Sequence, residues 1–557
     1  MHRAHVAGVA LILVAAAGAL AFRLPRLDLR PMHTDEAVHA VKAGELLETG
    51  RYTYDPNEYH GPTPYYFALP LIRLFGVKTF AETNETMFRM VPALFGVALV
   101  LLLVGVWDAL GPLALVCAGM LTAVSPAMTF YSRYYIQETL LVFFTFAVIV
   151  CGWRYACSPK LRWALLAGAS LGFMCATKET CVLAFGCMAG AAAFVWVHAR
   201  CGHPSRSHSD TRAQGFRARD HPRKAPAEVA AAPPRRGIRG VHIALAVGTA
   251  VLVSALFLSG FFTNLRGPLG AVHAYLRYVG RAAADATRND GAAYHVHPWH
   301  YYLSTLLYFK NAPGPWWSEA MIVVLAVVGA VAAGWFPDRA VPGNRRFVRF
   351  LACYTVLMTV AYAAIPYKTP WCLLGFLHGM ILLAGVGVAS LVRLARYVPL
   401  RALVGVGFAA GALHLGVQAY CDNFVYYADT RNPYVYAHTS TDVLRLAQRV
   451  NDLAELHPDG RAMLVKVMAP GADYWPLPWY LRRLQQVGYW TYVPDTPDAP
   501  VVIASVELED ALAGRLCGLY QQEYYGLRPE VLLTVYIRSD LWATFMESRA
   551  RRTRNAG

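Results

Sequence analysis

Residues 6–37 read VAGVALILVAAAGALAFRLPRLDLRPMHTDEA. The apolar part, Val6–Phe22, is long enough to cross a bilayer, which takes roughly 17–25 residues. Asp35 and Glu36 follow in the polar part. Ionised groups beside a bilayer are costly unless they line a wet cavity or meet a partner. The stretch therefore predicts a membrane helix followed by a polar site at the membrane surface.

Val6–Phe22 also resembles the apolar region of a signal peptide. We expect a retained anchor, because Arg23-Leu24-Pro25-Arg26 follows it and no clear small-residue cleavage site does.

The rest of the chain repeats the apolar pattern. Of its 557 residues, 56% are hydrophobic and 15% are charged, against about 25% charged in soluble proteins. The sequence predicts a polytopic α-helical membrane protein with about eleven spans. They are Val6–Phe22, Thr86–Trp107, Pro112–Phe130, Thr139–Tyr155, Trp163–Ala176, Cys181–Val197, His242–Phe262, Trp317–Phe336, Phe347–Ile365, Trp371–Val392 and Ala402–Tyr420.

The net charge of +16 reflects topology rather than nucleic-acid binding, because no nucleic-acid-binding motif is visible. Basic residues concentrate in the loop 198–240, before Phe347 and around residues 393–401. These positions share one side if the N-terminus is cytoplasmic, as the positive-inside rule favours. Arg23, Arg26 and Arg30 alone argue the other way. The larger set predicts a multi-pass protein of the cell inner (plasma) membrane with an external C-terminal part.

Short amphipathic segments lie between the spans on the external side, at Ala37–Glu48, Pro64–Phe75 and Tyr301–Phe309. After Tyr420 the pattern becomes that of an α/β domain. It predicts a helix at Asp442–Leu453 and strands at Ala462–Met468, Val487–Tyr492, Val501–Ser505 and Val531–Ile537. We therefore divide the chain into a transmembrane domain, 1–420, and an extracytoplasmic domain, 421–557. Cys421 and Cys517, both in this last part, are candidates for a disulfide.

Asp35 and Glu36 are the first candidate catalytic residues. A carboxylate at a partly dry site can deprotonate a hydroxyl, and its neighbour can orient it or bind a cation. The structural alternative is a helix start with Thr34 as N-cap and the acids in the first turn.

Further external residues supply cations, acids and rings. Arg133 is a candidate phosphate clamp and Glu138 a second acid, with an Arg133–Glu138 ion pair as the alternative. Lys178 faces a donor phosphate or forms a snorkelling pair with Glu179. The remaining candidate contacts are His60 in a rigid turn, and Tyr367 and Lys368 in the turn 366–371.

His295, His297 and His300 lie close together in sequence. His297 and His300 are candidate ligands for Mg²⁺ or Mn²⁺, although their spacing matches no strong metal motif. Aromatic packing with hydrogen bonding is the alternative.

Together these features resemble the GT-C superfamily of membrane glycosyltransferases. The stretch His33–His39, the turn Tyr59–Pro62 and the segment Asp473–Leu481 are similar to a flippase-activity-associated, mannosyltransferase-like branch. That branch is related to protein O-mannosyltransferases and the aminoarabinose transferase of lipid A. The resemblance implies inverting transfer of a sugar from a polyprenyl-phosphate donor to a glycan, lipid or protein acceptor on the external face.

Carried over by position, the resemblance makes Asp35 the catalytic base, Glu36 its partner and Glu138 the second acid. His60 stands near a Lys-Pro phosphate contact of the aminoarabinose transferases. A flippase or transporter subunit, or a non-catalytic assembly protein of a glycan pathway, stays an alternative. Charges collect at the external helix ends rather than at mid-span, which favours surface chemistry over transport.

Overall fold

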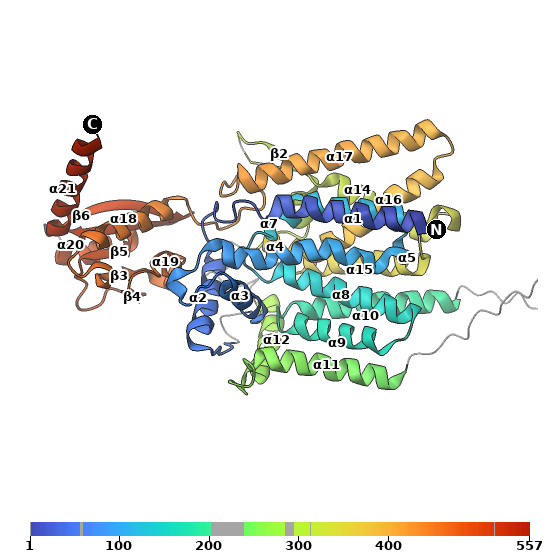
Figure 1. Cartoon of the computed structure of the whole chain (residues 1–557), viewed down its shortest axis with the longest axis horizontal. Helices are drawn as coiled ribbons and strands as arrows, with labels where there is room; N and C mark the ends of the chain where they lie inside the picture. The colour runs from blue at the N-terminus through green and yellow to red at the C-terminus, as the bar shows by residue number, and fades with distance from the viewer. Residues whose placement is uncertain are drawn as a thin grey trace, which may run out of the picture.

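A helical bundle carries a smaller α/β domain at one end (Figure 1). This computed structural model describes residues 2–55, 60–201, 239–284, 295–311, 313–516 and 518–556, with side chains except at 2–7, 201, 277–284 and 553–556. Residues 202–238, most of the predicted basic loop, lie outside the described residues. Cys517 lies outside them too, and its pairing with Cys421 stays a prediction.

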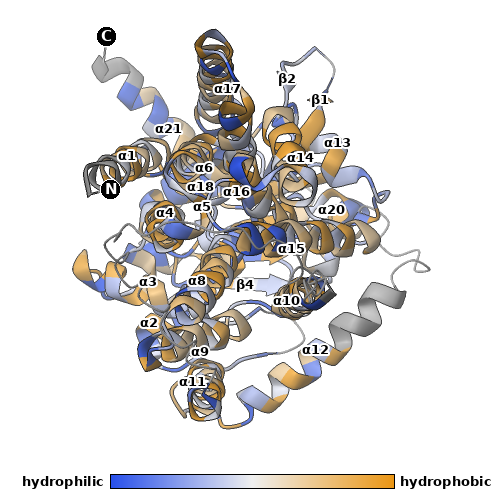
Figure 2. Ribbon diagram, turned by 90° about the vertical axis from the view of Figure 1, so that its right-hand side faces the viewer, coloured by the Kyte–Doolittle hydropathy of each residue, from blue (hydrophilic) through white to orange (hydrophobic). Residues whose placement is uncertain are grey.

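Eleven apolar helical stretches of the described chain match the eleven predicted spans, and seven are long enough to cross a membrane. Figure 2 looks along the bundle, where hydrophobic residues cover most of these helices. The helices are α1 (His2–Arg23), α4 (Glu85–Leu102, extended by η2, Leu103–Val106, and α5, Trp107–Leu110), α6 (Pro112–Val124), α8 (Glu138–Cys157), α9 (Leu161–Cys175), α10 (Cys181–Cys201), α11 (Gly240–Leu258), α14 (Ala320–Trp335), α15 (Arg345–Ala364), α16 (Leu374–Leu394, preceded by η5, Pro370–Leu373) and α17 (Val398–Phe424).

The predicted span Pro112–Phe130 is interrupted. It divides into α6 and a short α7 (Pro126–Tyr131) at Ser125. Pro126 disfavours helical backbone at the residue before it, and the Ser125 hydroxyl accepts a hydrogen bond from the Met128 N–H as the cap of α7. The break turns the chain toward the α/β end of the bundle.

Four helices lie between the spans at that same end: α2 (Thr34–Thr49), α3 (Thr63–Leu74), α12 (Gly267–Ala284) and α13 (Tyr301–Leu307) (Figure 1). Three of them match the predicted amphipathic segments, and α12 was not predicted. A two-stranded hairpin, β1 (Phe309–Lys310) and β2 (Trp316–Trp317), follows α13. Short 3₁₀ turns lie at η1 (Phe80–Glu82) and η4 (Asp338–Ala340).

The C-terminal domain is a five-stranded sheet in the order β4-β3-β5-β7-β6. The strands are β3 (Leu464–Met468), β4 (Gln486–Trp490), β5 (Val501–Ser505), β6 (Tyr520–Arg528) and β7 (Val531–Arg538). The pairs of β3 with β4 and β5 are parallel, and those of β7 with β5 and β6 are antiparallel. The helices are α18 (Asp442–Leu456), α19 (Leu477–Tyr480), α20 (Glu509–Leu516) and α21 (Ser539–Ala556), with 3₁₀ turns η6 (Gly460–Ala462), η7 (Pro470–Ala472) and η8 (Val506–Leu508).

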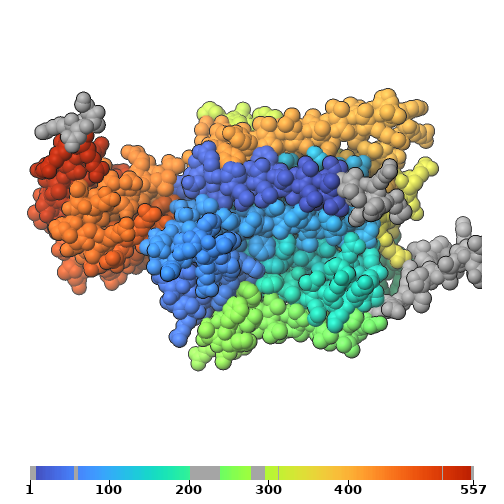
Figure 3. Space-filling view, viewed as in Figure 1, coloured from blue at the N-terminus to red at the C-terminus, as the bar shows by residue number. Residues whose placement is uncertain are grey.

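The predicted helix at 442–453 and all four predicted strands are confirmed, and β6 was missed. Figure 3 shows this domain projecting from the bundle end that carries α2 and α3. Trp479 donates its indole N–H to Glu85 at 2.9 Å, and the Tyr480 hydroxyl accepts from the Met32 N–H at 2.7 Å. The domain therefore rests directly on the loop that leads to Asp35. The division at residue 420 stays a prediction, and α17 itself continues to Phe424.

Candidate active site at the α/β end of the bundle

The two adjacent carboxylates at the start of α2 have opposite surroundings. His33, rather than Thr34, caps the helix: its Nδ1 accepts a hydrogen bond from the Asp35 N–H at 3.1 Å. The Glu36 carboxylate accepts from the His33 N–H at 3.0 Å and completes a capping box. The Asp35 side chain is 45% exposed, whereas that of Glu36 is fully buried.

Glu36 is enclosed by donors. Arg89 binds both carboxylate oxygens at 2.7 Å, and the Tyr135 N–H donates to one of them at 2.9 Å. Burial would raise the pKa of Glu36, but the Arg89 and Arg30 guanidinium groups lower it to about 2. Glu36 was predicted to be the partner of a catalytic Asp35. Its carboxylate is instead buried and accepts hydrogen bonds from Arg89 and from backbone N–H groups. It holds the start of α2 on α4 and the segment after α7.

Asp35 keeps its charge in a cationic setting. Burial would raise its pKa, but electrostatic interactions with the nearby His33, His39, His60 and Lys178 side chains outweigh that effect and hold the pKa below its usual value. An ionised, partly exposed carboxylate can accept a proton from a bound hydroxyl or contribute oxygens to a divalent cation.

Lys178 and Glu179 reach the site from the turn between α9 and α10. Lys178 forms a buried ion pair with Glu138, the first residue of α8. Glu179 accepts from the Tyr54 hydroxyl at 3.1 Å and lies 2.7 Å from Nδ1 of His60. The structure thus brings five of the predicted residues into one region: Asp35, His60, Glu138, Lys178 and Glu179.

The turn that carries His60 requires glycine at its next position. A Cβ at Gly61 would lie 2.0 Å from the Ala176 carbonyl oxygen, at the end of α9. The close approach lets the Thr63 N–H donate to that carbonyl at 3.3 Å and sets His60 beside Glu179.

Arg133 does not face the site, contrary to the predicted phosphate clamp. Its guanidinium donates to the carbonyl oxygens of Arg23, Pro25 and Arg26 at 3.1, 2.8 and 2.9 Å. A fourth bond reaches Phe22 at 3.2 Å. These are carbonyls at the end of α1 and just after it, where orphan carbonyls need donors. The predicted ion pair with Glu138 is also absent, because Glu138 pairs with Lys178.

Lys368 is likewise taken up by the backbone. Its ammonium donates to the carbonyl oxygens of Ile365 and, at 3.2 Å, His297. Burial lowers its pKa. The predicted role of neutralising a phosphate therefore requires Lys368 to leave two carbonyls. Tyr367 beside it is 42% exposed, and its ring lies 4.7 Å from that of His295.

The predicted metal ligands make aromatic contacts. His297 stacks on Tyr301 with ring centroids 4.1 Å apart, and His300 packs against Trp299 at 5.5 Å. Within the described residues, no three His, Cys, Asp or Glu side chains form a group that could hold a metal. A metal contribution stays a prediction, and Asp35 is the residue whose exposed carboxylate suits it.

Two histidines with free ring nitrogens complete the region. Since Nδ1 of His33 accepts a hydrogen bond, its proton is on Nε2, and that atom is buried without a partner. Nε2 of His438 is buried and unpartnered too, and the two rings stack at 6.1 Å. His438 comes from the linker before α18, and no sequence pattern connects it to His33.

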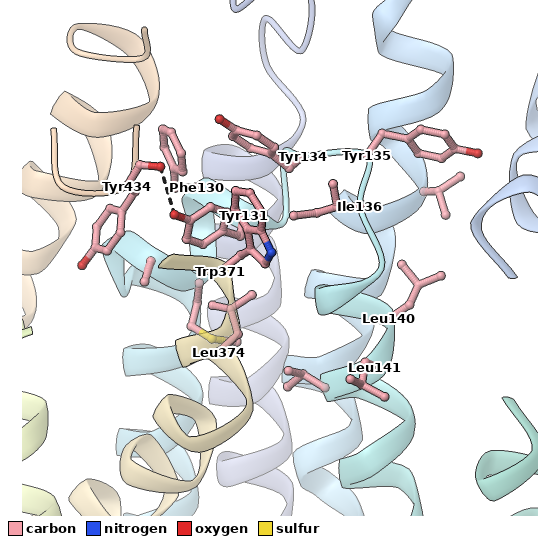
Figure 4. Packing of buried hydrophobic residues seen from close by; sticks show 14 of the residues in the cluster. Phe130, Tyr131, Tyr134, Tyr135, Ile136, Leu140, Leu141, Trp371, Leu374 and Tyr434 are labelled. Atoms are coloured by element: carbon pink, nitrogen blue, oxygen red, sulfur yellow. Dashed lines mark hydrogen bonds between the residues drawn. The ribbon is translucent and has the colours of Figure 1, made fainter. Parts of the chain in front are cut away.

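Aromatic side chains form the wall beside these histidines. Trp371 lies 5.6 Å from the His33 ring and 6.2 Å from Tyr131. Figure 4 shows this packing and the 2.9 Å hydrogen bond from the Tyr131 hydroxyl to the Tyr434 carbonyl. Such rings are suited to contact with a sugar face.

An apolar crevice descends from the site between α8, α10, α15 and α16. It is narrow, with room for little more than one water molecule, and it begins at Glu138, Trp371 and Tyr362. A second, equally narrow space lies between α8, α15 and α16 and reaches Phe146 and His378. The crevice leads from the charged groups into the apolar interior of the bundle.

Residues 63–213 match the family described as dolichyl-phosphate-mannose-protein mannosyltransferase (PMT). This range includes Glu138, Lys178 and Glu179 but not Asp35. No match was found among curated protein sequences.

Solved structures share the fold along nearly the whole chain. ArnT from Cupriavidus metallidurans bound to undecaprenyl phosphate is 13% identical with a TM-score of 0.58, over 94% of this chain and 97% of that one. The Archaeoglobus fulgidus oligosaccharyltransferase in the apo form is 11% identical with a TM-score of 0.54, over 97% and 77%. The archaeal oligosaccharyltransferase AglB from Archaeoglobus fulgidus, in complex with an inhibitory peptide and a dolichol-phosphate, has the same identity and coverage and a TM-score of 0.52. The predicted fold is confirmed: the chain shares the fold of these structures, a helical bundle with a sheet-containing domain at its C-terminal end.

Proposed function

We propose that this protein transfers a sugar from a polyprenyl-phosphate donor to an acceptor hydroxyl, with Asp35 as the general base. The family match and the shared fold support a membrane glycosyltransferase that uses a polyprenyl-phosphate-linked sugar. The assignment of Asp35 as the base rests on the different surroundings of the two adjacent acids. Asp35 is partly exposed and ionised among cations, whereas Glu36 is buried in its bonds to Arg89.

The reaction follows from these positions. Asp35 removes the proton from the acceptor hydroxyl as its oxygen attacks the anomeric carbon of the donor. The bond from that carbon to the phosphate oxygen breaks, and its electron pair leaves with the polyprenyl phosphate. Because no enzyme–sugar bond forms, a single displacement inverts the anomeric configuration.

Lys178 and His60 both interact electrostatically with Asp35 and are the candidate partners of a phosphate. Each already faces a carboxylate, Glu138 and Glu179 respectively. A bound phosphate would share these cations with the carboxylates and would be stabilised as charge develops on the leaving oxygen. The free Nε2 atoms of His33 and His438, beside Trp371, are positioned for hydroxyl groups of the sugar.

We place the first isoprene units of the carrier along the apolar side chains below Glu138, which must move apart to admit them because the crevice between them is narrow. The family description favours mannose as the sugar. The acceptor is a glycan, lipid or protein.

Charge asymmetry supports an external site. Basic residues gather at the bundle end opposite the α/β domain, where α10 ends and α11 begins (Figure 1). They include Arg154, Arg162, Arg200, Arg239, Arg345, Arg349, Arg393 and Arg401. The positive-inside rule assigns that end to the cytoplasm and the Asp35 end to the outside of the inner membrane.

The test compares Asp35→Asn with Asp28→Asn, an exposed aspartate in the same loop. Purified full-length protein in native lipids would receive polyprenyl-phosphate-mannose together with an acceptor extract. Mass spectrometry then follows donor consumption and released polyprenyl phosphate. Loss of the base should slow transfer by about 100-fold or more, whereas the Asp28 variant should match the wild type.

Transfer at the wild-type rate by the Asp35 variant would refute the assignment. Donor that crosses the membrane without losing its sugar would favour a transporter instead.

A further inference from the structure

The turn that brings Lys178 and Glu179 to the site is bracketed by two cysteines. Cys175 is the last residue of α9 and Cys181 is the first of α10. Within the turn, the Lys178 N–H donates to the Met174 carbonyl at 3.2 Å and the Cys181 N–H to the Lys178 carbonyl at 3.1 Å. The backbone is therefore tightly folded, and it brings the two cysteines together.

Both cysteines converge on one hydroxyl group. The Tyr275 hydroxyl, from α12, lies 3.5 Å from Sγ of Cys181 and donates to the Cys175 carbonyl at 3.4 Å. The two thiols are not bonded to each other in this structure, but they are close enough to interact electrostatically. Cys181 is fully buried, and Cys175 is partly exposed.

We propose that Cys175 and Cys181 are an oxidisable pair that forms an intramolecular disulfide across this turn. The proposal rests on the proposed function in one respect, the assignment of this end of the bundle to the outside, where disulfides persist. The Cys421–Cys517 prediction concerns a different part of the chain.

The chemistry is an exchange with a disulfide-bearing oxidant, such as a disulfide oxidoreductase. Cys175, the more exposed thiol, loses its proton and attacks one sulfur of the oxidant's disulfide to form a mixed disulfide. Cys181 then loses its proton and attacks the sulfur of Cys175. The oxidant leaves as a dithiol that has gained two electrons and two protons, so atoms and charge balance.

The bond would hold the end of α9 against the start of α10. These ends position Lys178 beside Glu138 and Glu179 beside His60. A covalent closure of so short a loop restricts the freedom of the turn when the donor is absent. The pair would thus be a positioning device for the charged side of the site.

The experiment counts oxidised thiols in the full-length protein in native membranes. Membranes are denatured in N-ethylmaleimide to block free thiols, then reduced and labelled with a polyethylene-glycol maleimide. Wild type should carry two more labels than Cys175→Ser or Cys181→Ser. Cys151→Ser, which removes a buried cysteine inside α8, should retain the wild-type count.

Mass spectrometry of non-reduced digests should find the peptides of Cys175 and Cys181 joined. Equal label counts in wild type and both variants would overturn the proposal, even if an added oxidant could close the pair. Because the count does not depend on activity, it separates this proposal from the role of Asp35. Oxidised cysteines in a protein without transferase activity would refute only the proposed function.

Discussion

A buried ion pair between Glu36 and Arg89 fixes the start of α2. Neither residue has the role proposed for Asp35, the catalytic candidate beside Glu36. Arg89 donates to both oxygens of Glu36 and to the carbonyls of Leu27, Arg30 and Pro31. One guanidinium therefore joins the loop before α2, the helix itself and α4. Asp35 depends on this network for its position, although its own carboxylate does not take part.

Removing Arg89 should be severely destabilising. Arg89→Met leaves the Glu36 carboxylate buried with most of its compensation lost, which typically costs about 3–5 kcal/mol. We expect a large fall in the unfolding temperature of the purified protein. The double variant Glu36→Gln/Arg89→Met should recover part of it, because the buried carboxylate charge is then removed together with its main partner. A single variant as stable as wild type would contradict the pairing.

The pH dependence of transfer tests the setting of Asp35. His60 is one of the groups that lower its pKa. His60→Gln removes that contribution, so the pKa of Asp35 should rise and the carboxylate should be protonated at a higher pH. The acid limb of the kcat/KM profile should move upward by as much as about one pH unit. His198→Gln, an exposed histidine near the end of α10 at the opposite end of the bundle, is the control. An unmoved acid limb would exclude Asp35 as the titrating base or His60 as its neighbour.

At the scale of elements, the packing of α2 on α3 contains a neutral histidine. His39 is buried and its Nδ1 lies 2.9 Å from the Tyr65 hydroxyl. Burial lowers the pKa of His39 to about 3, with Asp35 and Glu36 opposing the shift and His60 and Lys178 adding to it. The unfolded chain binds this proton at about pH 6.5. Stability from His39 is therefore complete above pH 6.5 and is lost as the pH falls toward 3.

This linkage predicts a specific acid sensitivity. Between pH 7 and pH 5, the free energy of unfolding of wild type should fall more than that of His39→Gln, by at most about 1.4 kcal/mol per pH unit below pH 6.5, which unfolding measurements at each pH would check. His273→Gln, an exposed position on α12, should fall as wild type does. Parallel decreases in all three proteins would show that His39 is not buried in its neutral form.

Spans and most strands could be predicted because each carries its own pattern. Apolar length defines α4 or α16, and runs of branched residues define β5 and β7. The edge strand β6 (Tyr520–Arg528) was missed, since its polar face is exposed and it pairs on one side only. The break at Ser125 was also missed, although Ser125-Pro126 is a local signal of a helix boundary.

The site could be predicted only in part, for a related reason. Residue type and external position selected Asp35, His60, Glu138, Lys178 and Glu179. They could not separate a cation that faces the site from one that caps backbone carbonyls, as Arg133 and Lys368 do. That distinction depends on carbonyls distant in sequence. The pairing of His33 with His438, 405 residues apart by their numbers, is likewise a property of the folded chain.

At the scale of the whole molecule, the α/β domain and the bundle meet at the loop before Asp35. The Met32 N–H donates to the Tyr480 hydroxyl, and the Thr439 hydroxyl donates to the Met32 carbonyl at 2.7 Å. Arg482 donates to the Thr83 carbonyl at 2.6 Å across the same interface. One hydrophobic cluster continues from the bundle into the face of the sheet covered by α18. The domain is therefore placed to hold the catalytic loop in position.

Tyr480→Phe isolates this coupling, because it deletes one oxygen and keeps the ring. The buried Met32 N–H would lose its acceptor, at a cost of about 1–3 kcal/mol. We expect a lower unfolding temperature and, because Asp35 lies three residues beyond Met32, a fall in kcat that exceeds the change in KM. Tyr492→Phe, 62% exposed in the same domain, should leave both unchanged. If Tyr480→Phe lowered stability but left kcat intact, the domain would support the fold of the loop without setting the position of its base.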